Sequence, residues 1–480
     1  MKSIVIIGGG FSGTITAINL ARLSTVPLQI TIIDKNRASC RGIAYSTRNG
    51  SHLLNVLARN MSALADQPNH FVEWLATRSE YLDEPISTLR EKFVPRRVYG
   101  DYLHNLFHWY SRILADEKNM RLELIHDEVK DVVMEKQGAS ITLAGGKIIL
   151  ADKVVLAVGN QEPSPFRVRG LDIRSPKYIG NPWIGWEEKL PPKDQDLLLI
   201  GTGLTMVDAF LTLQDLGWRG MIFAVSRNGL LPLSHFKGFE YPDLLDDEST
   251  AMSFPKIFSI FKQHYKAAKA RKLNTAILVD KLRPFTQRIW QSFSLREKKQ
   301  FNRHFRTRWN VMRHRIAPEI HHQLSEAIAQ KRLEIIKGRL SECEEAGGKI
   351  RISINSSGVK RVIEAGVVVN CTGPQESYVP SESSLFNNLF SRGTIQPDEM
   401  NMGIKVAPNF SVLDRAGKSS EILFAMGAIM KGTLWETVAV PELRSQAFRL
   451  AETIAGQLAE NIVEKSPISE VVEDVHEYSI

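Results

Sequence analysis

Apolar and polar residues follow a regular order over the first 34 positions. Residues 3–7 are a β-branched apolar run, residues 15–23 carry apolar side chains at helical spacing, and a second apolar run at 28–33 ends in Asp34. Short apolar runs are typical of buried strands, whereas recurrence every three or four residues is typical of a helix. The pattern therefore predicts strand, helix and strand, the first unit of a doubly wound parallel sheet.

The same order returns near the middle of the chain. An apolar run at 197–200 is followed by a glycine turn, a helical stretch at 208–216 and a third apolar run at 221–225. Six prolines between positions 163 and 192 separate this unit from the first, in a stretch where a long helix or strand would be interrupted. We expect an α/β fold with two Rossmann-like dinucleotide-binding domains and a boundary in this connection.

The remaining pattern indicates that the first domain is discontinuous. Apolar runs at 350–354, 367–369 and 422–426 predict strands, and residues 433–458 have the spacing of a long helix. The expected parts are an FAD-binding domain at 1–165 and 370–464, an NAD(P)-binding domain at 190–369, a helical insertion within it at about 251–335, and a loose acidic tail at 465–480.

The positive charge of the chain is concentrated in one segment. The formal net charge is +8, but residues 256–316 contain 17 Lys or Arg against 2 Asp or Glu, a balance of +15 that leaves −7 for the rest. The aromatic residues interleaved with these cations are Trp290, Phe293, Phe301, Phe305 and Trp309. Three interpretations stay open: a lid over polyanionic cofactors or an acidic substrate, a solvated cationic face, or a nucleic-acid site whose rings stack on bases. Nucleic acid is the least expected partner.

Cysteine usage and hydropathy exclude several other classes. The three cysteines, Cys40, Cys343 and Cys371, lie far apart, so there is no disulfide framework, no C-x-x-C dithiol and no zinc spacing. No apolar stretch approaches the roughly 18 residues that a membrane helix needs. We therefore expect a protein of the reducing cytoplasm, with no metal site and no membrane partner.

Gly8, Gly10 and Gly13 form the pattern G-x-G-x-x-G between the first strand and the first helix. The first glycine permits a tight turn, the second lets the backbone approach a pyrophosphate, and the third lets the helix pack closely on the strand. Phosphates would bind the free N–H groups of the helix N-terminus, and Asp34 would accept hydrogen bonds from an adenosine ribose. The candidate residues of this site are Gly8, Gly10, Phe11, Ser12, Gly13, Asp34 and Lys35. A glycine turn without a ligand is the alternative.

The second unit has a weaker motif, Gly201-Thr202-Gly203, with Met206 where a third glycine would stand. Its second strand leads into Arg227 instead of an acid, and arginine can bind a 2′-phosphate that an acid would repel. We therefore expect NADP(H) here, and FAD at the first site because the second already offers a place for the nicotinamide. The candidate residues are Gly201, Gly203, Leu204, Thr205, Ser226 and Arg227. A degenerate domain that only packs, with Arg227 in solvent, is the alternative.

Several blocks of the sequence resemble one family over nearly the whole chain. These blocks are Gly8 to Leu20, Gly42-Ile43-Ala44-Tyr45-Ser46, His52-Leu53-Leu54-Asn55-Val56, Met61-Ser62, Asn370-Cys371-Thr372-Gly373-Pro374 and Gly432-Thr433-Leu434-Trp435-Glu436. They resemble the bacterial FAD-NAD(P)-binding proteins, a family of flavoproteins with two dinucleotide folds. More distantly, the chain is similar to the flavin N-hydroxylating and Baeyer–Villiger-type monooxygenases.

This resemblance implies further cofactor contacts. In the monooxygenases a loop near the position of Asn55 lies beside the flavin, so Asn55 and Met61 are candidates. The segments that cross between the domains would correspond to Gly159 and Gly373, which are candidates as well. The resemblance also implies that FAD and NADP(H) are both bound.

One departure from the wider flavoprotein class lies near the end of the chain. That class has a Gly-Asp pair that binds the ribityl chain, whereas this sequence has Gly427-Ala428, so the ribityl contact must come from elsewhere. The helix opening near Thr433 and Leu434 would offer backbone donors to the pyrimidine edge of the flavin, where negative charge accumulates on reduction. A plain helix cap is the alternative for Thr433.

The resemblance implies an FAD-dependent oxidoreductase that is reduced by NADPH and hydroxylates a small nucleophilic substrate with dioxygen. An NADPH-dependent reductase that passes electrons to another acceptor and a nucleotide-binding module without catalysis are the alternatives, and the missing dithiol argues against a disulfide reductase. No catalytic residue is assigned, because no triad or acid pair outranks the cofactor as the source of reactivity. His235 is a candidate for proton transfer, with a structural role as its alternative.

Overall fold

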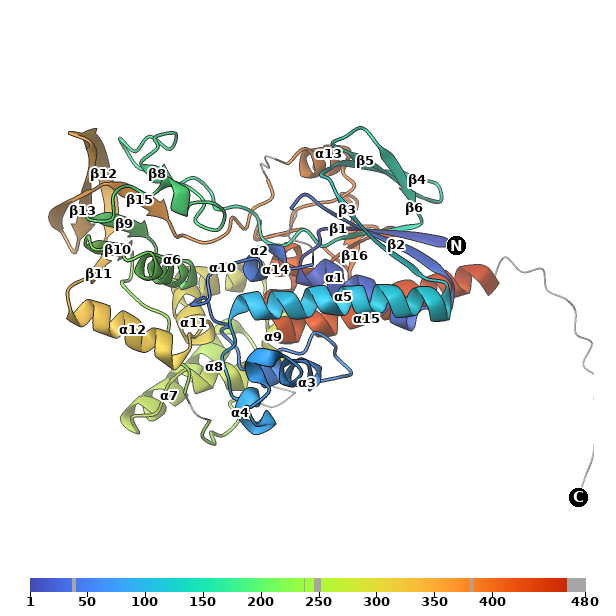
Figure 1. Cartoon of the computed structure of the whole chain (residues 1–480), viewed down its shortest axis with the longest axis horizontal. Coiled ribbons are helices and arrows are strands. Elements are labelled where there is room, and N and C mark those ends of the chain that lie inside the picture. The colour runs from blue at the N-terminus through green and yellow to red at the C-terminus, as the bar shows by residue number, and fades with distance from the viewer. Residues whose placement is uncertain (37–39, 237, 246–251, 380–382, 464–480) are drawn as a thin grey trace, which may run out of the picture.

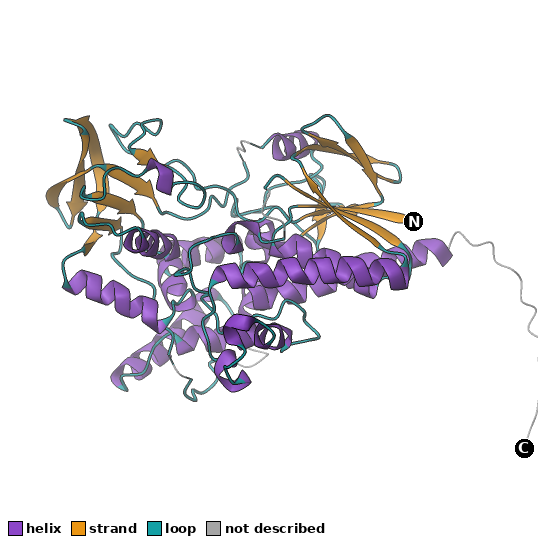
Figure 2. Ribbon diagram, viewed as in Figure 1, coloured by secondary structure: helices purple, strands orange, loops and turns teal. Residues whose placement is uncertain are grey.

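The computed structural model describes residues 1–36, 40–236, 238–245, 252–379 and 383–463. The acidic tail expected at 465–480 lies outside these residues. Two parallel sheets lie towards the two ends of the molecule (Figure 1). Helices fill the space between and below the sheets (Figure 2).

The first sheet has six strands in the order β16-β17-β7-β1-β2-β3, and only the pair β16 and β17 is antiparallel. Its strands are β1 Lys2–Ile7, β2 Leu28–Asp34, β3 Arg121–His126, β7 Lys153–Leu156, β16 Ser411–Leu413 and β17 Ser419–Ala425. The last four residues of β1 are buried, as expected for a parallel strand that is covered on both faces. Residues from both ends of the chain thus form one sheet.

Helices and a small side sheet cover the first sheet. Helix α1, Phe11–Leu23, packs against both α5, Arg96–Lys118, and α15, Val440–Val463. The smaller elements of this region are α2 Gly42–Tyr45, α3 His70–Ala76, α4 Ile86–Arg90, the antiparallel strands β4 Val129–Glu135, β5 Gly138–Leu143 and β6 Ile148–Ala151, and α13 Ser384–Arg392.

The second sheet has five parallel strands in the order β11-β10-β9-β15-β8. Its strands are β8 Tyr178–Ile179, β9 Leu197–Ile200, β10 Ile222–Ser226, β11 Leu333–Lys337 and β15 Val367–Asn370. Helices α6, Leu204–Asp215, and α12, Pro318–Ala329, contribute to its core. An antiparallel sheet of β12 Arg339–Ala346, β13 Lys349–Ser356 and β14 Val359–Ala365 lies beside it. The expected fold class is confirmed.

In the described part of the chain between β10 and α12, five helices share a separate core with Met402 and Trp435. They are α7 Phe254–Ala270, α8 Ile277–Leu282, α9 Thr286–Ser292, α10 Leu295–His304 and α11 Arg306–Arg313. The five aromatic rings singled out in the basic segment are all buried in this core. They therefore offer no exposed faces on which nucleic-acid bases could stack, and that interpretation of the basic segment is wrong.

The long helix predicted at 433–458 is in fact two helices. The short α14, Lys431–Leu434, is separated from α15 by a bend at Trp435, whose φ of 65° and ψ of −68° are those of a tight γ-turn. The N–H of Glu436 closes that turn with a 2.8 Å hydrogen bond to the carbonyl of Leu434. Pro441 fits the first turn of α15, because a backbone N–H at that position would have no acceptor within the helix.

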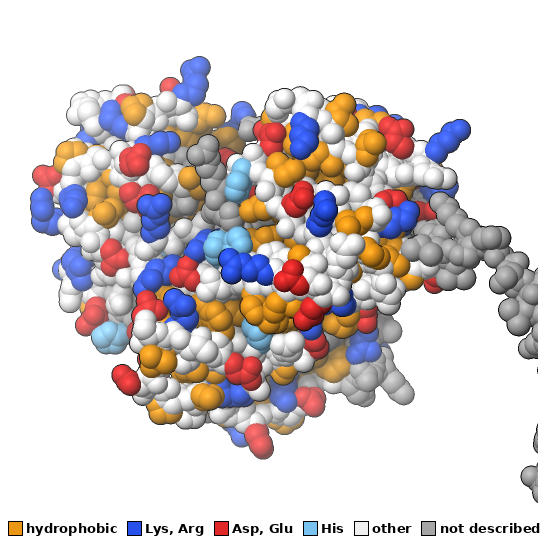
Figure 3. All heavy atoms as spheres, turned by 45° about the vertical axis from the view of Figure 1, so that its right-hand side comes forward, with side chains coloured by type: hydrophobic (Ala, Val, Ile, Leu, Met, Phe, Trp, Pro, Cys, Tyr) orange, Lys and Arg blue, Asp and Glu red, His pale blue; other side chains and the backbone are white. Residues whose placement is uncertain are grey.

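Charged side chains of both signs are interspersed over the face shown in Figure 3. No single-sign patch dominates that face. Among the helices of the described ranges, none is both long and apolar enough to cross a membrane.

Candidate cofactor-binding sites

The first glycine turn has a geometry that only glycine fits. Gly8 has a φ of 110°, and a Cβ built on it would lie 2.2 Å from the carbonyl oxygen of Ala157 at the end of β7. A Cβ on Gly13 would lie 1.9 Å from the carbonyl oxygen of Gly8. The N–H groups of Phe11 and Ser12 at the start of α1 find no acceptor in the described part of the chain. A helix N-terminus of this kind suits a phosphate.

Asp34 lies where the sequence predicts it, at the end of β2, and its side chain is buried. Its Oδ2 accepts a 2.7 Å hydrogen bond from the N–H of Gly9, and its Oδ1 accepts a 2.8 Å bond from the N–H of Asn36. Each carboxylate oxygen can accept a further hydrogen bond. Asp34 therefore fixes the glycine turn and keeps acceptor capacity for a ribose, whereas Lys35 beside it is exposed.

Two further glycine segments come close to the start of α1. A Cβ on Gly42, whose φ is 59°, would lie 3.0 Å from the Cα of Gly10. A Cβ on Gly427, whose φ is 84°, would lie 2.9 Å from the Oγ of Ser12. The structure thus brings Gly10, Ser12 and Gly427 together, with bare backbone around the N-terminus of α1, as a bound pyrophosphate requires.

The second glycine turn repeats the first in its geometry. Gly201 has a φ of 111°, and a Cβ on it would lie 2.4 Å from the carbonyl oxygen of Cys371 at the end of β15. A Cβ on Gly203 would meet nothing within 4 Å. The N–H groups of Leu204 and Thr205 at the start of α6 have no acceptor among the described residues. This turn fits a second phosphate group.

Ser226 occupies the place in the second unit that Asp34 has in the first. Its Oγ lies 2.8 Å from the Oγ1 of Thr202 and accepts a 3.0 Å hydrogen bond from the N–H of Gly229. A neutral hydroxyl therefore holds the second turn where a carboxylate holds the first. Ser226 thus adds no negative charge beside this turn.

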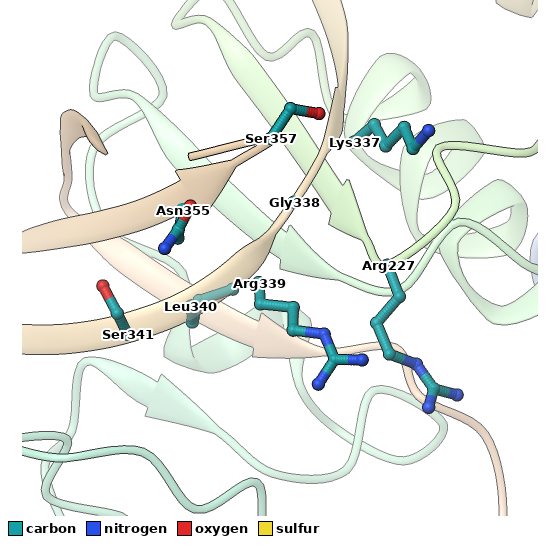
Figure 4. A pocket seen from close by; sticks show the side chains of 8 residues that line it. All are labelled: Arg227, Lys337, Gly338, Arg339, Leu340, Ser341, Asn355 and Ser357. Atoms are coloured by element: carbon teal, nitrogen blue, oxygen red, sulfur yellow. The ribbon is translucent and has the colours of Figure 1, made fainter. Parts of the chain in front are cut away.

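A basic pocket of about 490 Å³ opens where β10 and β11 end. Its cations are Arg227 after β10, Lys337 at the end of β11 and Arg339 at the start of β12, and its other lining residues are neutral. The guanidinium groups of Arg227 and Arg339 extend to the same side, whereas Lys337 extends away from them (Figure 4). None of the three cations forms an ion pair with a described residue. Sequence reasoning found Arg227 but missed Lys337 and Arg339.

Residues of the 47–55 loop join the two domains. The Nε2 of His52 lies 3.0 Å from the carbonyl oxygen of Asp208 on α6. Nearby, Arg96 on α5 forms a bidentate ion pair with the Asp208 carboxylate at 2.7 and 3.1 Å. The Nε2–H of His235 donates a 2.8 Å hydrogen bond to the carbonyl oxygen of Asn55. The candidate Asn55 is therefore held at the junction of both domains.

His235 is better described as a structural link than as a proton carrier. Burial, together with the nearby Arg315, lowers its pKa from 6.5 to about 4. The ring packs against Phe93 with centroids 4.9 Å apart. His235 is therefore neutral at pH 7 and has its Nε2–H committed to Asn55.

The two segments that cross between the domains are hydrogen-bonded to each other. The side chain of Asn370 donates to the carbonyl of Ser164 at 2.9 Å, and that of Gln161 donates to the carbonyl of Ser377 at 2.8 Å. The candidates in these segments, Gly159 and Gly373, have φ values of 69° and 88°, and a Cβ on either would meet nothing within 4 Å. Both glycines thus have free space beside them.

The remaining candidate residues lie in different surroundings. Met61 and Leu434 are buried in the core of the first domain, with 2% and 7% of their surface exposed, so they offer little surface to a cofactor. The hydroxyl of Thr433 donates to the carbonyl of Ile404 at 3.3 Å instead of capping a helix. The cap interpretation of Thr433 is therefore wrong.

The basic insertion binds the segment 432–442, a contact that sequence reasoning missed. The indole N–H of Trp290 donates to the carbonyl oxygen of Gly432 at 2.8 Å. The side-chain amide of Gln287 donates to the backbone carbonyl oxygen of Glu436 at 2.7 Å. Arg283 forms a bidentate ion pair with Glu442 at 2.6 and 2.9 Å. These contacts attach the insertion of the second domain to the first domain.

A further ion pair cluster lies beside Trp435. Glu376 pairs with both Arg306 and Lys431, and each cation also lies over the Trp435 ring, at 5.6 and 5.4 Å from its centroid. Burial opposes ionisation of Glu376, but the two cations outweigh it and lower the pKa of that carboxyl. Part of the positive charge of the insertion is thus used to pair acids of other segments.

Comparison with known proteins supports the geometry. Residues 5–161 match the family model described as FAD-NAD(P)-binding, while no curated protein sequence matches the chain. Ornithine N-hydroxylase from Kutzneria sp. 744, solved with reduced FAD, NADP⁺ and L-ornithine, has a TM-score of 0.65 at 14% identity, covering 95% of this chain and 99% of that chain.

Two other solved structures extend this comparison. Cadaverine monooxygenase from Erwinia amylovora, bound to FAD, has a TM-score of 0.62 at 14% identity and covers 99% of this chain and 98% of that chain. Bacillithiol disulfide reductase from Bacillus cereus has a TM-score of 0.51 at 15% identity, covering 95% and 99%. The expected resemblance is therefore confirmed: residues 5–161 match the FAD-NAD(P)-binding family, and the chain shares the fold of these flavoproteins.

Proposed function

We propose that this protein is an FAD-dependent oxidoreductase that is reduced by NADPH and hydroxylates a small nucleophilic substrate with dioxygen. The observation that carries the proposal is the repeated glycine turn: Gly8 and Gly201 have φ values of 110° and 111° and lie in the same way against the end of a neighbouring strand. Each turn opens a helix with free N–H groups. Two dinucleotides would therefore bind, one to each domain.

The residues present fit FAD at the first site and NADPH at the second. The N-terminus of α1, with Gly42 and Gly427 beside it, would hold the FAD pyrophosphate, and Asp34 would accept from its ribose. Arg227 and Arg339 would bind the 2′-phosphate of NADPH by charge-assisted hydrogen bonds. When both cofactors are bound, the chemistry they supply is hydride transfer to the flavin followed by reaction with dioxygen.

The substrate is a small molecule that carries a nucleophilic nitrogen or carbon. Ornithine N-hydroxylase and cadaverine monooxygenase, which share the fold, are named for an amino acid and a diamine. In the cluster of Arg306, Lys431 and Glu376 two cations share one carboxylate, and the remaining positive charge would suit an acidic group on the substrate. The three buried, unpaired cysteines, together with NADPH as reductant, favour the reducing cytoplasm as the place of action.

One spectroscopic experiment tests the proposal. The flavin absorbance of FAD-replete protein is recorded before and after anaerobic NADPH, and NADPH consumption in air is then followed with a panel of amines and amino acids. A monooxygenase bleaches with NADPH and yields a hydroxylated product. Bleaching without any product, and turnover only with an added electron acceptor, would favour the reductase. A flavin that NADPH does not reduce would favour a binding module without catalysis.

A further inference from the structure

A small apolar cavity, partly open to the surface, lies among the helices of the insertion and Trp435. Its volume is about 40 Å³, and aromatic and aliphatic side chains of α7, α9, α10 and α11 form most of its wall. The hydroxyl of Thr286 donates to the carbonyl of Leu282, and the indole N–H of Trp290 donates to Gly432, so these polar atoms are used elsewhere. Water in the cavity would therefore lack hydrogen-bond partners and is disfavoured.

The volume of the cavity limits what it can hold. An apolar cavity of roughly 150 Å³ binds benzene, and roughly 10–15 Å³ is the least that accommodates one water. At about 40 Å³ the cavity is too small for an aromatic ring and large enough for a diatomic molecule. A small apolar gas is the class of ligand that fits both the size and the chemistry of the wall.

The position of the cavity connects it with the candidate flavin site. One wall consists of Trp290 and Trp435, whose rings lie 4.7 Å apart at 30°. Trp290 donates directly to the carbonyl of Gly432, and Trp435 lies two positions after Thr433, which remains a candidate flavin contact, so this segment adjoins the wall. Phe258 is the lining residue that is only partly buried, and it lies on α7.

We propose that this cavity binds molecular oxygen next to the candidate flavin site. The inference rests on the proposed function, because a flavin monooxygenase uses dioxygen as its co-substrate. The insertion would then raise the local concentration of dioxygen while keeping water out.

Xenon tests the site without depending on catalysis. Crystals of the FAD-replete protein are pressurised with xenon, and we expect one xenon atom between Ile257, Phe301 and Trp435. Ile257→Phe, which fills the cavity, should abolish this peak, and Leu282→Phe serves as a second filling variant where the first does not fold. Val279→Leu is the matched control, because Val279 lies in the same core and does not line the cavity. No xenon in the wild-type cavity would overturn the proposal.

The kinetic test uses flavin reduced by dithionite, so that it is independent of NADPH. The second-order rate constant for reoxidation by dioxygen should fall at least threefold in Ile257→Phe and stay unchanged in Val279→Leu. An unchanged rate in a filled variant that has lost xenon would show that the cavity is only a packing defect. Failure of the proposed function would appear separately, as a flavin that NADPH does not reduce in any variant.

Discussion

The indole N–H of Trp290 lies 2.8 Å from the carbonyl oxygen of Gly432. Through this hydrogen bond the insertion of the second domain holds α14 of the first domain, directly before the bend at Trp435. The bend itself is at Trp435, whose positive φ is strained for a residue with a bulky side chain. Strain of this kind persists only where the surrounding structure determines it. The insertion therefore acts as a clamp on the segment 432–435.

Replacing Trp290 by Phe should weaken this clamp while keeping an aromatic ring in the core. The Gly432 carbonyl would lose its donor in a buried place, so we expect the free energy of unfolding to fall by about 1–3 kcal/mol. We also expect a shift of the visible absorption bands of bound FAD. Trp309→Phe is the control, because Trp309 lies in the same core. Equal spectra and equal stability in both variants would contradict the clamp.

Arg227→Ala should weaken NADPH binding and leave NADH binding nearly unchanged, since only NADPH carries the 2′-phosphate. The loss of a charge-assisted hydrogen bond of about 1.5–3 kcal/mol corresponds to a rise in Kd of roughly 10- to 150-fold. Arg339→Ala should act in the same direction. Arg351→Ala, on β13 outside the pocket, is the control, and titrations of the anaerobic protein give the constants. Equal losses for both nucleotides would refute the assignment.

Gly10→Leu should yield protein that purifies without yellow colour. A Cβ on Gly10 would lie 3.5 Å from the Cα of Gly42, so a longer side chain would fill the space between Gly42 and the start of α1. Gly50→Leu is the control, because a Cβ there meets nothing within 4 Å. Absorbance near the flavin maximum, relative to protein, measures the outcome. A yellow Gly10→Leu protein would contradict the assignment of the FAD pyrophosphate to this site.

His235 should make the protein less stable in acid. Its pKa is about 4 in the fold and about 6.5 when unfolded, so the unfolded chain binds more protons between these values. Stability from this group is complete above pH 6.5 and is lost as the pH falls towards 4, by at most about 3 kcal/mol. His235→Asn should flatten this part of the curve in urea unfolding at several pH values. An unchanged dependence of unfolding free energy on pH in His235→Asn would contradict the lowered pKa of His235.

The glycine turns were predictable because their signal is local. Strand, turn and helix are adjacent in the sequence, and within this unit Gly13 meets the carbonyl oxygen of Gly8, which leaves no room for a Cβ. Asp34 belongs to the same local unit. In such a unit the order of residue types alone determines the neighbours.

The basic pocket and the clamp were not predictable in the same way. Lys337 and Arg339 follow Arg227 by more than 100 positions, and only the parallel pairing of β10 with β11 brings them beside it. Likewise, Arg283 and Arg306 find their acids in other segments, at Glu442 and Glu376. Composition reveals the excess of cations, but their partners depend on the tertiary fold.

The six-stranded sheet also has a consequence for synthesis on the ribosome. Strand β17 lies between β7 and β16, so the sheet lacks two of its strands until about residue 425 has emerged. All five strands of the second sheet precede residue 371. Domains generally fold as units as the chain emerges. The domain that contains β1 would therefore complete its fold after the second sheet, and flavin capture would have to wait until β17 has emerged.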